Sequence, residues 1–464
     1  MRSLATACLA LALLAAWPAA AQVDVPPTPG ALNNAVNNNT TPGQVFRLQS
    51  GQTYLLTDRM EPTVDVVIEA DGGDCPVVPA DCPLIQPIDP GGGPERIMQI
   101  ETAGVSATLR GVAATMRSPS GTRDERMFRL RADGVSLTLD RTYLYDEATM
   151  IVRVDNSAPN IYAYDSVIKD VGDINGNLDE GRFIDDRGSD MGEVVVTGCT
   201  FYNIVNRVIR DDGGDLQRLR FEHNTLNYVR RRAVEAGDVE EALVQNLMLV
   251  NVGFQGADAG EINSMISLDS TGTGTENHLV RNVNFYVDPS IIENPDGEIQ
   301  LLNSVARDAN DGFEETLLEE VVTFADGPTA FFDFAGEPFD FSYAGSFDSF
   351  SASTGGQPLG ALIWFGLEVD AEDGAAPTGF AFAGAAPNPF AARTALAFTL
   401  DRAADVRLDV FDLLGRRVAT LAEGPHAAGT HTATFDARAL PAGVYLARLS
   451  ADGQTATRKL TLLR

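Results

Sequence analysis

A two-part pattern that recurs between residues 127 and 285 limits the fold of this chain more than any other feature of the sequence. One half of each repeat is an apolar pair followed by alternating polar and apolar residues, as in Met127–Arg131. In the other half, a strand-like segment passes through a turn residue such as Asn, Asp or Gly and reaches a large apolar residue three positions later. Six residues close these segments: Leu144, Ile168, Phe201, Leu226, Leu249 and Phe285.

The spacing of the six closing residues predicts the architecture. Successive members lie 24, 33, 25, 23 and 36 residues apart, which is a period near 24 with two insertions. A repeat of this length, built from short strands, corresponds to one coil of a solenoid in which each coil packs only against its neighbours. No helical period competes over this stretch. We therefore predict an all-β chain whose main part is a right-handed parallel β-helix.

Alignment of the repeats stacks charged residues into columns. Equivalent residues of neighbouring coils would lie about 4.8 Å apart, so opposite charges in one column can pair along the outside of the solenoid. The third position of the apolar-pair half contains Arg129, Arg153, Asp185, Arg210 and Glu235, and the fifth contains Arg131, Asp155, Arg187, Asp212, Gly237 and Asp269. Each exposed pair would contribute about 0–1 kcal/mol. We interpret the columns chiefly as a structural ladder, with an active-site role for their arginines as the alternative.

Three segments resemble known β-helix proteins. Gly43–Leu56 is similar to the first coil of many extracellular β-helices, and Ser351–Trp364 is similar to the closing segment of pectate-lyase-like proteins and of related β-helix families of unknown function. Phe201–Ile204 resembles a coil sequence of the latter families. The resemblance implies a fold more than an activity. We expect the aromatic-rich residues 295–350 to cap the open end of the solenoid and shield it from edge pairing.

The first 21 residues have the features of a secretory signal peptide. Arg2 precedes an apolar run, Leu4–Trp17, which ends at Pro18. The small residues Ala19–Ala21 then offer a cleavage site before Gln22. The run is too short to span a bilayer, and no later apolar stretch reaches about 18 residues. We therefore expect export, with no transmembrane segment in the mature chain.

The end of the chain is a series of short alternating segments separated by turn signals. They predict a small Ig-like β-sandwich, with strands at residues 395–400, 406–411, 417–421, 430–435, 444–449 and 456–462.

Four motifs in this region resemble, in the same order, the type A C-terminal sorting domain of the type IX secretion system. They are Pro387–Phe390, Val410–Val418, Leu440–Tyr445 and the basic Arg458–Leu460. The resemblance implies that the type IX secretion machinery is a partner and that the chain passes through the outer membrane. It also implies that this domain is normally removed afterwards, which leaves a secreted or cell-surface protein.

Composition supports a division of the chain into four parts. Residues 1–21 are the expected signal peptide, 22–367 a β-helix passenger with capping segments, 368–377 an acidic linker, and 378–464 the sorting domain. The last part carries 10 basic and 7 acidic residues, whereas residues 22–377 carry 23 basic and 58 acidic residues, a net charge of −35. Such a surface repels nucleic acid and anionic lipid and favours cations. Adaptation to salt explains this acidity as well as a charge-selected ligand does.

Three cysteines remain after the expected cleavage: Cys75, Cys82 and Cys199. An oxidising compartment permits a disulfide between Cys75 and Cys82, which would close a Pro-rich loop. Cys199 lies within a predicted strand, where a small thiol packs well in a core. We expect it to be free and unreactive.

The 33-residue spacing contains an insertion rich in Asp, Asn and Gly. Asp173, Asn175, Asn177 and Asp179 stand at alternate positions, the spacing at which short oxygen side chains converge on Ca²⁺. The segment is not an EF-hand, because Gly176 is misplaced. The same residue types also form plain surface loops, so a calcium site and a simple loop both stay open.

Candidate catalytic residues adjoin this insertion. Polysaccharide lyases of the fold that this region resembles need a base that removes the proton α to a uronate carboxylate, and a cation that neutralises the carboxylate. Lys169 precedes the insertion, and Arg187 and Arg210 stand on following coils. These three residues, with Ca²⁺ as cofactor, are the candidates for such chemistry.

Other observations favour a binding or structural role. The characteristic catalytic strings of the lyase families are missing, and the acidic surface would repel a bare polyuronate unless calcium bridged the two. The sequence contains no nucleophile elbow, zinc-spaced His/Cys cluster or phosphate-cradling Gly loop. Our hypothesis is an exported β-helix protein directed at an extracellular polysaccharide, by binding it or as a surface scaffold. The alternative is a Ca²⁺-assisted lyase acting on a uronate polymer.

Overall fold

The computed structural model describes most of the chain from residue 22 onward. The ranges it does not describe are 1–21, 73–80, 89–95, 124–125, 156–157, 257–260, 270–276, 304–316, 333–338, 355, 366, 368–380, 387–392, 401–403, 413–415, 427–428, 439, 442, 452–453 and 463–464. The expected signal peptide and linker therefore lie outside the described residues.

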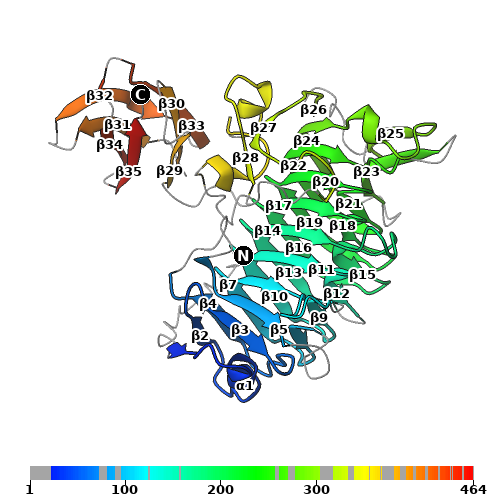
Figure 1. The fold of residues 1–464 in the computed structure, drawn as a ribbon. Helices are drawn as coiled ribbons and strands as arrows, with labels where there is room; N and C mark the ends of the chain where they lie inside the picture. Colours follow the sequence, from blue (N-terminus) through cyan, green and yellow to red (C-terminus); the bar gives the residue numbers. More distant parts are fainter. Residues whose placement is uncertain are drawn as a thin grey trace, which may run out of the picture.

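The chain winds into a solenoid of parallel strands that form three faces (Figure 1). The first face contains β1 (Gln22–Asp24), β2 (Gln44–Leu48), β4 (Val66–Ala70), β7 (Ser106–Arg110), β10 (Ser136–Asp140), β13 (Asn160–Tyr164), β16 (Met191–Thr197), β19 (Leu216–Glu222), β22 (Val239–Val252) and β24 (Asn277–Tyr286). The second face contains β3 (Thr53–Leu56), β5 (Leu84–Pro87), β8 (Ala113–Thr115), β11 (Tyr143–Glu147), β14 (Val167–Val171), β17 (Thr200–Ile204), β20 (Thr225–Val229), the ends of β22 and β24, and β26 (Leu317–Leu318). The third face contains β6 (Met98–Ile100), β9 (Phe128–Leu130), β12 (Met150–Val154), β15 (Arg182–Asp186), β18 (Arg207–Arg210), β21 (Val234–Ala236), β23 (Ile262–Leu268) and β25 (Glu298–Leu302).

The register of the second face confirms the repeat that the sequence predicts. Leu144 lies opposite Ile168, Ile168 opposite Phe201, and Phe201 opposite Leu226. The column continues through Leu249 to Phe285. All but the last of these side chains are fully buried in the single core of the solenoid. Each such side chain contributes about 1.5–3 kcal/mol through burial, so the column fixes the register of the coils. The fold is a parallel β-helix.

The turn residues of the repeat form the bend between the first and second faces. Asp165, His223 and Asn246 have φ values of 44°, 50° and 59°, and Gly198 has a φ of 71°. This left-handed conformation favours Gly, Asn and Asp. It explains why those residue types recur at this position in the repeat.

A short helix covers the N-terminal end of the solenoid. Helix α1 (Ala31–Asn37) buries Leu32 and Val36, each 1% exposed, in the same core as the strands. Within the described residues, no helix has the length and apolar character needed to cross a membrane.

The aromatic-rich residues 295–350 do more than the expected capping of the open end. Their first described strands, β25 and β26, continue the third and second faces. The next two, β27 (Phe324–Asp326) and β28 (Asp340–Tyr343), pair antiparallel. Phe339 and Phe341 pack against Tyr202, on the outer side of the second face. The outer side of this face carries apolar residues, which are stabilised when they are shielded from water. The segment therefore covers one side of the solenoid. The predicted closing segment follows it, and Trp364 donates a hydrogen bond to Thr200 Oγ1 at 2.6 Å.

The C-terminal strands form two antiparallel sheets. One contains β29 (Ala381–Ala386), β30 (Arg393–Leu400) and β33 (Gly429–Asp436), and the other contains β31 (Ala404–Asp412), β32 (Arg417–His426), β34 (Gly443–Ala451) and β35 (Gln454–Leu462). This arrangement fits the predicted Ig-like sandwich. Strand β29, an Ala-rich segment without clear alternation, was not among the predicted strands.

Candidate functional site

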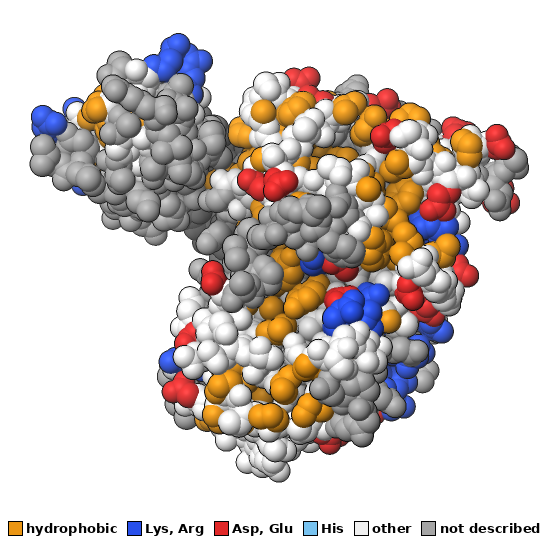
Figure 2. Space-filling view, in the orientation of Figure 1, with side chains coloured by type: hydrophobic (Ala, Val, Ile, Leu, Met, Phe, Trp, Pro, Cys, Tyr) orange, Lys and Arg blue, Asp and Glu red, His pale blue; other side chains and the backbone are white. Residues whose placement is uncertain are grey.

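The charged columns form on the outer side of the third face. Arg153 lies opposite Asp185, and Asp185 opposite Arg210. Figure 2 shows both basic and acidic side chains along the right-hand edge of the solenoid, where Figure 1 places β12, β15 and β18. Asp185 has no exposed surface. Three arginines contact its carboxylate: Arg182 at 3.4 Å, Arg187 at 3.1 Å and Arg210 at 3.5 Å. The predicted ladder register is confirmed, and Arg187 and Arg210 both bind one buried carboxylate.

Lys169 lies in β14 on the second face, apart from those two arginines. Its side chain is 6% exposed, and Nζ lies 2.8 Å from Oδ2 of Asp170. The rings of Tyr145 and Tyr202, from the preceding and following coils, flank the ammonium at 6.0 Å and 5.5 Å. An ion pair and two aromatic faces stabilise a charged ammonium, whereas a general base must be neutral to accept a proton. The three catalytic candidates therefore do not meet in one site.

The insertion next to Lys169 leaves and rejoins the solenoid between two glycines. Gly172 and Gly181 have φ values of 101° and 95°. A Cβ on Gly172 would lie 2.6 Å from Cβ of Val205, and one on Gly181 would lie 2.8 Å from the same atom. Only glycine fits both the backbone conformation and this close approach. The pair allows the extra residues to extend outward without disturbing the stack of coils.

The four candidate calcium ligands are exposed on this insertion and make local contacts. Oδ1 of Asp173 accepts a hydrogen bond from the Asn175 amide at 2.9 Å, and Oδ1 of Asn177 accepts one from the Asp179 amide at 3.1 Å. The Asp179 carboxylate lies 2.8 Å from Arg231. In the described part of the chain, no cluster of three or more His, Cys, Asp or Glu residues is arranged to hold a metal. The calcium site stays a prediction, and Asp179 would have to leave Arg231 to join it.

The cysteines differ in their environment. Cys199 is a free thiol with no exposed surface, and burial raises its pKa well above the ordinary value, as expected for an unreactive cysteine. Cys82 is disulfide-bonded and 3% exposed. Its predicted partner, Cys75, lies outside the described residues, so the pairing stays a prediction.

Two aspartates that the sequence patterns did not single out lie inside the solenoid. Asp186 lies opposite Val154 of the preceding coil, in a column of side chains that point into the core. Asp211 follows Arg210, which lies opposite Asp185, so it continues this column on the next coil. They are 0% and 4% exposed, and they share a side-chain hydrogen bond. The Asp186 carboxylate also accepts hydrogen bonds from the Ser189 amide at 3.0 Å. Burial, together with the charge of Asp186, raises the pKa of Asp211 to about 8. The pair therefore retains one proton at neutral pH.

A polar hollow of about 160 Å³ lies where the turns after the second face enter β18 and β21. We call it the arginine pocket. Its polar lining consists of three arginines, three amide side chains and one carboxylate: Arg207, Arg231, Arg232, Gln255, Asn263, Asn294 and Glu261.

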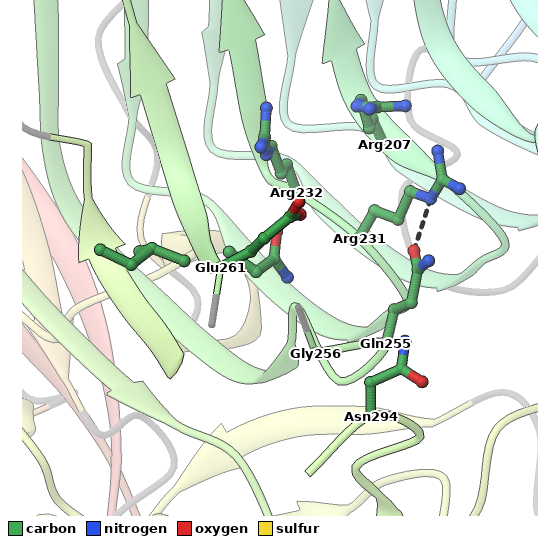
Figure 3. Close-up of a pocket in the computed structure, with 9 residues that line it drawn as sticks. Arg207, Arg231, Arg232, Gln255, Gly256, Glu261 and Asn294 are labelled. Atoms are coloured by element: carbon green, nitrogen blue, oxygen red, sulfur yellow. Dashed lines mark hydrogen bonds between the residues drawn. The ribbon is translucent and has the colours of Figure 1, made fainter. Parts of the chain in front are cut away.

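Close backbone contact builds the wall of the arginine pocket. Gly256 forms a β-bridge with Asn294, and a Cβ at this glycine would lie 2.4 Å from the Asn294 carbonyl oxygen. Figure 3 shows Arg231 joined to Gln255 by a hydrogen bond and the side chain of Glu261 extending toward Arg232. The pocket therefore presents hydrogen-bond donors and acceptors at positions set by the backbone.

Comparison with known families decides how the chain is delivered. Residues 385–462 match the model of the secretion system C-terminal sorting domain. The chain ends in a type IX sorting domain. This domain implies handling by the type IX secretion machinery and places the protein outside the cell, secreted or at the cell surface. No curated protein matches the chain at a significant level.

The arginine pocket belongs to the passenger, not to the sorting domain. The sequence patterns missed it because its residues come from separate coils and from the stretches around Gln255 and Asn294, which do not match the repeat. One signal was available: Arg207 and Arg232 each stand directly before an apolar pair that opens a strand of the third face. Two arginines at one position of the repeat indicate that their side chains share a surface.

Proposed function

We propose that the passenger binds an extracellular glycan and that the arginine pocket is its binding site. The observation that carries this proposal is the lining of the pocket, in which amides and guanidinium groups converge around a hollow of about 160 Å³. A sugar presents hydroxyl groups, each of which donates one hydrogen bond and accepts two. Amide side chains can both donate and accept, and guanidinium groups donate in a fixed fork. Such a lining matches sugar hydroxyls better than it matches an apolar ligand.

Delivery by the sorting domain supports the same proposal. An exported protein meets polysaccharides at the cell surface and in the medium, and the pocket lies in the part that the sorting domain delivers. A solenoid also offers a long, rigid surface on which neighbouring coils repeat the same geometry.

The lyase alternative receives less support from the geometry. Lys169 is 6% exposed and ion-paired with Asp170, and Arg187 contacts the buried Asp185 on another face. A general base needs access to the substrate proton within about 3 Å. We therefore propose binding ahead of cleavage of a uronate polymer.

Affinity electrophoresis of the exported protein through gels that contain single polysaccharides tests the proposal. We expect at least one acidic or neutral glycan to retard migration. Gln255→Ala and Asn294→Ala should each weaken the retardation, by roughly tenfold, because a lost hydrogen bond in a pocket costs on the order of 1–3 kcal/mol. Asn34→Ala, an exposed amide on helix α1, is the matched control and should have no effect. Equal retardation of all three variants would contradict the proposed site.

A further inference from the structure

Two tyrosines lie side by side on the outer side of the first face. Tyr162 and Tyr164 alternate along β13 with Ile161 and Ala163, which are buried in the core, and both tyrosines are partly exposed. Their ring centroids lie 6.4 Å apart, and their planes differ by 13°. Carbon atoms in contact lie about 3.5–4.0 Å apart, so neither ring covers the face of the other. The pair presents two nearly parallel aromatic surfaces, which we call the tyrosine platform.

The following coil holds the tyrosine platform in place. The hydroxyl of Tyr162 donates a hydrogen bond to Oε2 of Glu193 in β16 at 2.9 Å. Burial, and then this hydrogen bond, raise the pKa of Tyr162 to about 12, so the hydroxyl remains a donor at physiological pH. Tyr162 lies opposite Val195, and Tyr164 lies opposite Thr197. These two neighbours point away from the core but are only 5% and 6% exposed, so the platform rests on packed side chains.

The tyrosine platform interrupts a column of paired polar side chains on the first face. In the preceding coils of this column, Arg110 pairs with Asp140 at 2.7 Å, and Asp140 lies opposite Tyr164. After one further coil, the column continues with Glu222 and Gln245, whose side chains share a hydrogen bond. Paired side chains on neighbouring strands stabilise a sheet. The stack of coils therefore does not itself require an aromatic ring at this position.

The charges at the rim of the tyrosine platform are already paired. Asp140 pairs with Arg110, and Glu193 pairs with Arg218 at 3.2 Å. Thr138, opposite Tyr162 on the preceding coil, adds a short hydroxyl side chain. A neutral aromatic surface with hydroxyl groups and paired charges at its edge selects neither an anion nor a cation. It matches a neutral ligand that has both apolar and hydroxyl groups.

We propose that the tyrosine platform binds a neutral polysaccharide, whose sugar rings stack on Tyr162 and Tyr164. The platform lies on the first face, apart from the arginine pocket, so this inference goes beyond the proposed function and does not depend on it. A neutral sugar ring carries C–H groups on its faces, which pack against aromatic rings, and hydroxyl groups around its edge, which reach the polar rim. The net charge of −35 on residues 22–377 opposes a polyanion but does not repel a neutral chain.

Depletion of the exported protein from solution by suspended cellulose, mannan and chitin tests the inference. We expect at least one of these neutral polysaccharides to bind the protein, and molar sodium chloride should not weaken binding, because the contact is not ionic. Tyr162→Ala and Tyr164→Ala should each weaken binding by roughly tenfold, as expected for an aromatic residue at the centre of a contact. Tyr162→Phe keeps the ring and loses only the hydrogen bond to Glu193, so it should bind as the wild type does.

Two control variants separate the tyrosine platform from other sites. Tyr286→Ala removes a partly exposed tyrosine at the end of β24 and should not change binding. Gln255→Ala alters the arginine pocket and should also leave binding of these polysaccharides unchanged. Melting temperatures show whether each variant is folded. Loss of binding in Gln255→Ala, but not in folded tyrosine variants, would overturn this inference and leave the proposed function intact.

Two further outcomes would contradict the tyrosine platform. If the folded protein binds none of the neutral polysaccharides, the platform is not a binding site for them, whereas an acidic glycan bound through the arginine pocket would still support the proposed function. If the wild type is a dimer and the tyrosine variants are monomers in size-exclusion chromatography, the two rings pack against a second copy of the chain.

Discussion

Asp186 and Asp211 place two carboxyl groups in an interior column that neighbouring coils fill with Leu130 and Val154. An apolar side chain at either position would leave the backbone amides of the adjoining turns without their present acceptors, since Asp186 accepts from Ser189 and Asp211 from Gly214 at 3.4 Å. Two carboxylates in contact cannot both ionise inside a protein, so one keeps its proton. The pair accepts hydrogen bonds from the backbone of the turns. Because the pair also holds a titrating proton, the stability of the solenoid depends on pH.

Replacement of Asp211 by Asn should remove this pH dependence. The pKa of Asp211 is about 8 in the folded protein and near its ordinary value of 3.8 in the unfolded chain. Between these values the folded state binds more protons, so stability falls as pH rises, by up to about 1.4 kcal/mol per pH unit. Asp211→Asn can donate its amide to Asp186 without a titrating proton. We expect urea unfolding to show the variant gaining stability over the wild type between pH 5 and pH 8.

The exposed neighbour supplies the control for that experiment. Asp212→Asn changes the same charge on a side chain that is 55% exposed, and it should leave the slope of stability against pH in place. An unchanged slope in Asp211→Asn would mean that the pair does not share a proton.

The position of a side chain could be predicted where the same residue type recurs at one position of the repeat. It could not be predicted where a different residue type interrupts that column. Arg153, Asp185 and Arg210 could be assigned to one ladder because opposite charges recur at one position of the repeat. The interior aspartates could not, because the repeat predicts an apolar residue there and only the turn geometry explains the exception. The partner of Lys169 was equally hidden: Asp170 has the left-handed φ of 54°, and its carboxylate lies 2.8 Å from the Lys169 ammonium.

Strands, like side chains, could be predicted where the sequence repeats. Strands of the second face could be located from one apolar column, since register is set wherever one side of a strand is buried. Strand β29 and the aromatic segment around Phe339 and Phe341 could not, because neither repeats and both depend on surfaces formed by distant parts of the chain. The arginine pocket belongs to the same class, because part of its wall is the backbone contact between Gly256 and Asn294, which lie far apart in the chain.

The insertion after Gly172 contains the predicted calcium ligands. One of them, Asp179, also contacts the arginine pocket, which makes the calcium prediction more specific. Asp179 pairs with Arg231, so a cation that recruits Asp179 must release Arg231. We expect millimolar calcium to raise the melting temperature, since binding to the native state alone stabilises by about 2.7 kcal/mol at a hundredfold excess over Kd. The double change Asp173→Ala, Asp179→Ala should abolish the shift. Arg231→Gln should enlarge it, because the competing ion pair is gone.

Calcium could also act through the general acidity of the surface. The double change Glu240→Ala, Asp296→Ala removes two exposed carboxylates elsewhere and should not alter the response to calcium. If the loop variant responds to calcium as fully as the wild type does, the insertion is a plain loop.

At the scale of the whole molecule, two parts of opposite charge have different tasks. The sorting domain at residues 385–462 directs export, and the parallel β-helix carries the candidate pocket. Residues 378–464 have a net charge of +3 and residues 22–377 a net charge of −35. Neither part needs the other's core, since the buried residues of the C-terminal sandwich form a hydrophobic cluster of their own. A domain with its own core can be removed without unfolding its neighbour.

We therefore expect the delivered protein to begin near Gln22 and to lack the region after about Thr378. Mass spectrometry of culture supernatant and surface fractions should give a chain without the sorting domain. Native electrophoresis should show a faster anionic species than the uncleaved chain, since loss of residues 378–464 removes a net charge of +3 and about a fifth of the mass. A chain that stops at Pro377 is the control, and it should stay in the periplasm because it lacks the export signal. Detection of an intact C-terminus at Arg464 on protein outside the cell would show that the domain is retained after export. Intact protein confined to the periplasm would contradict delivery by the type IX route.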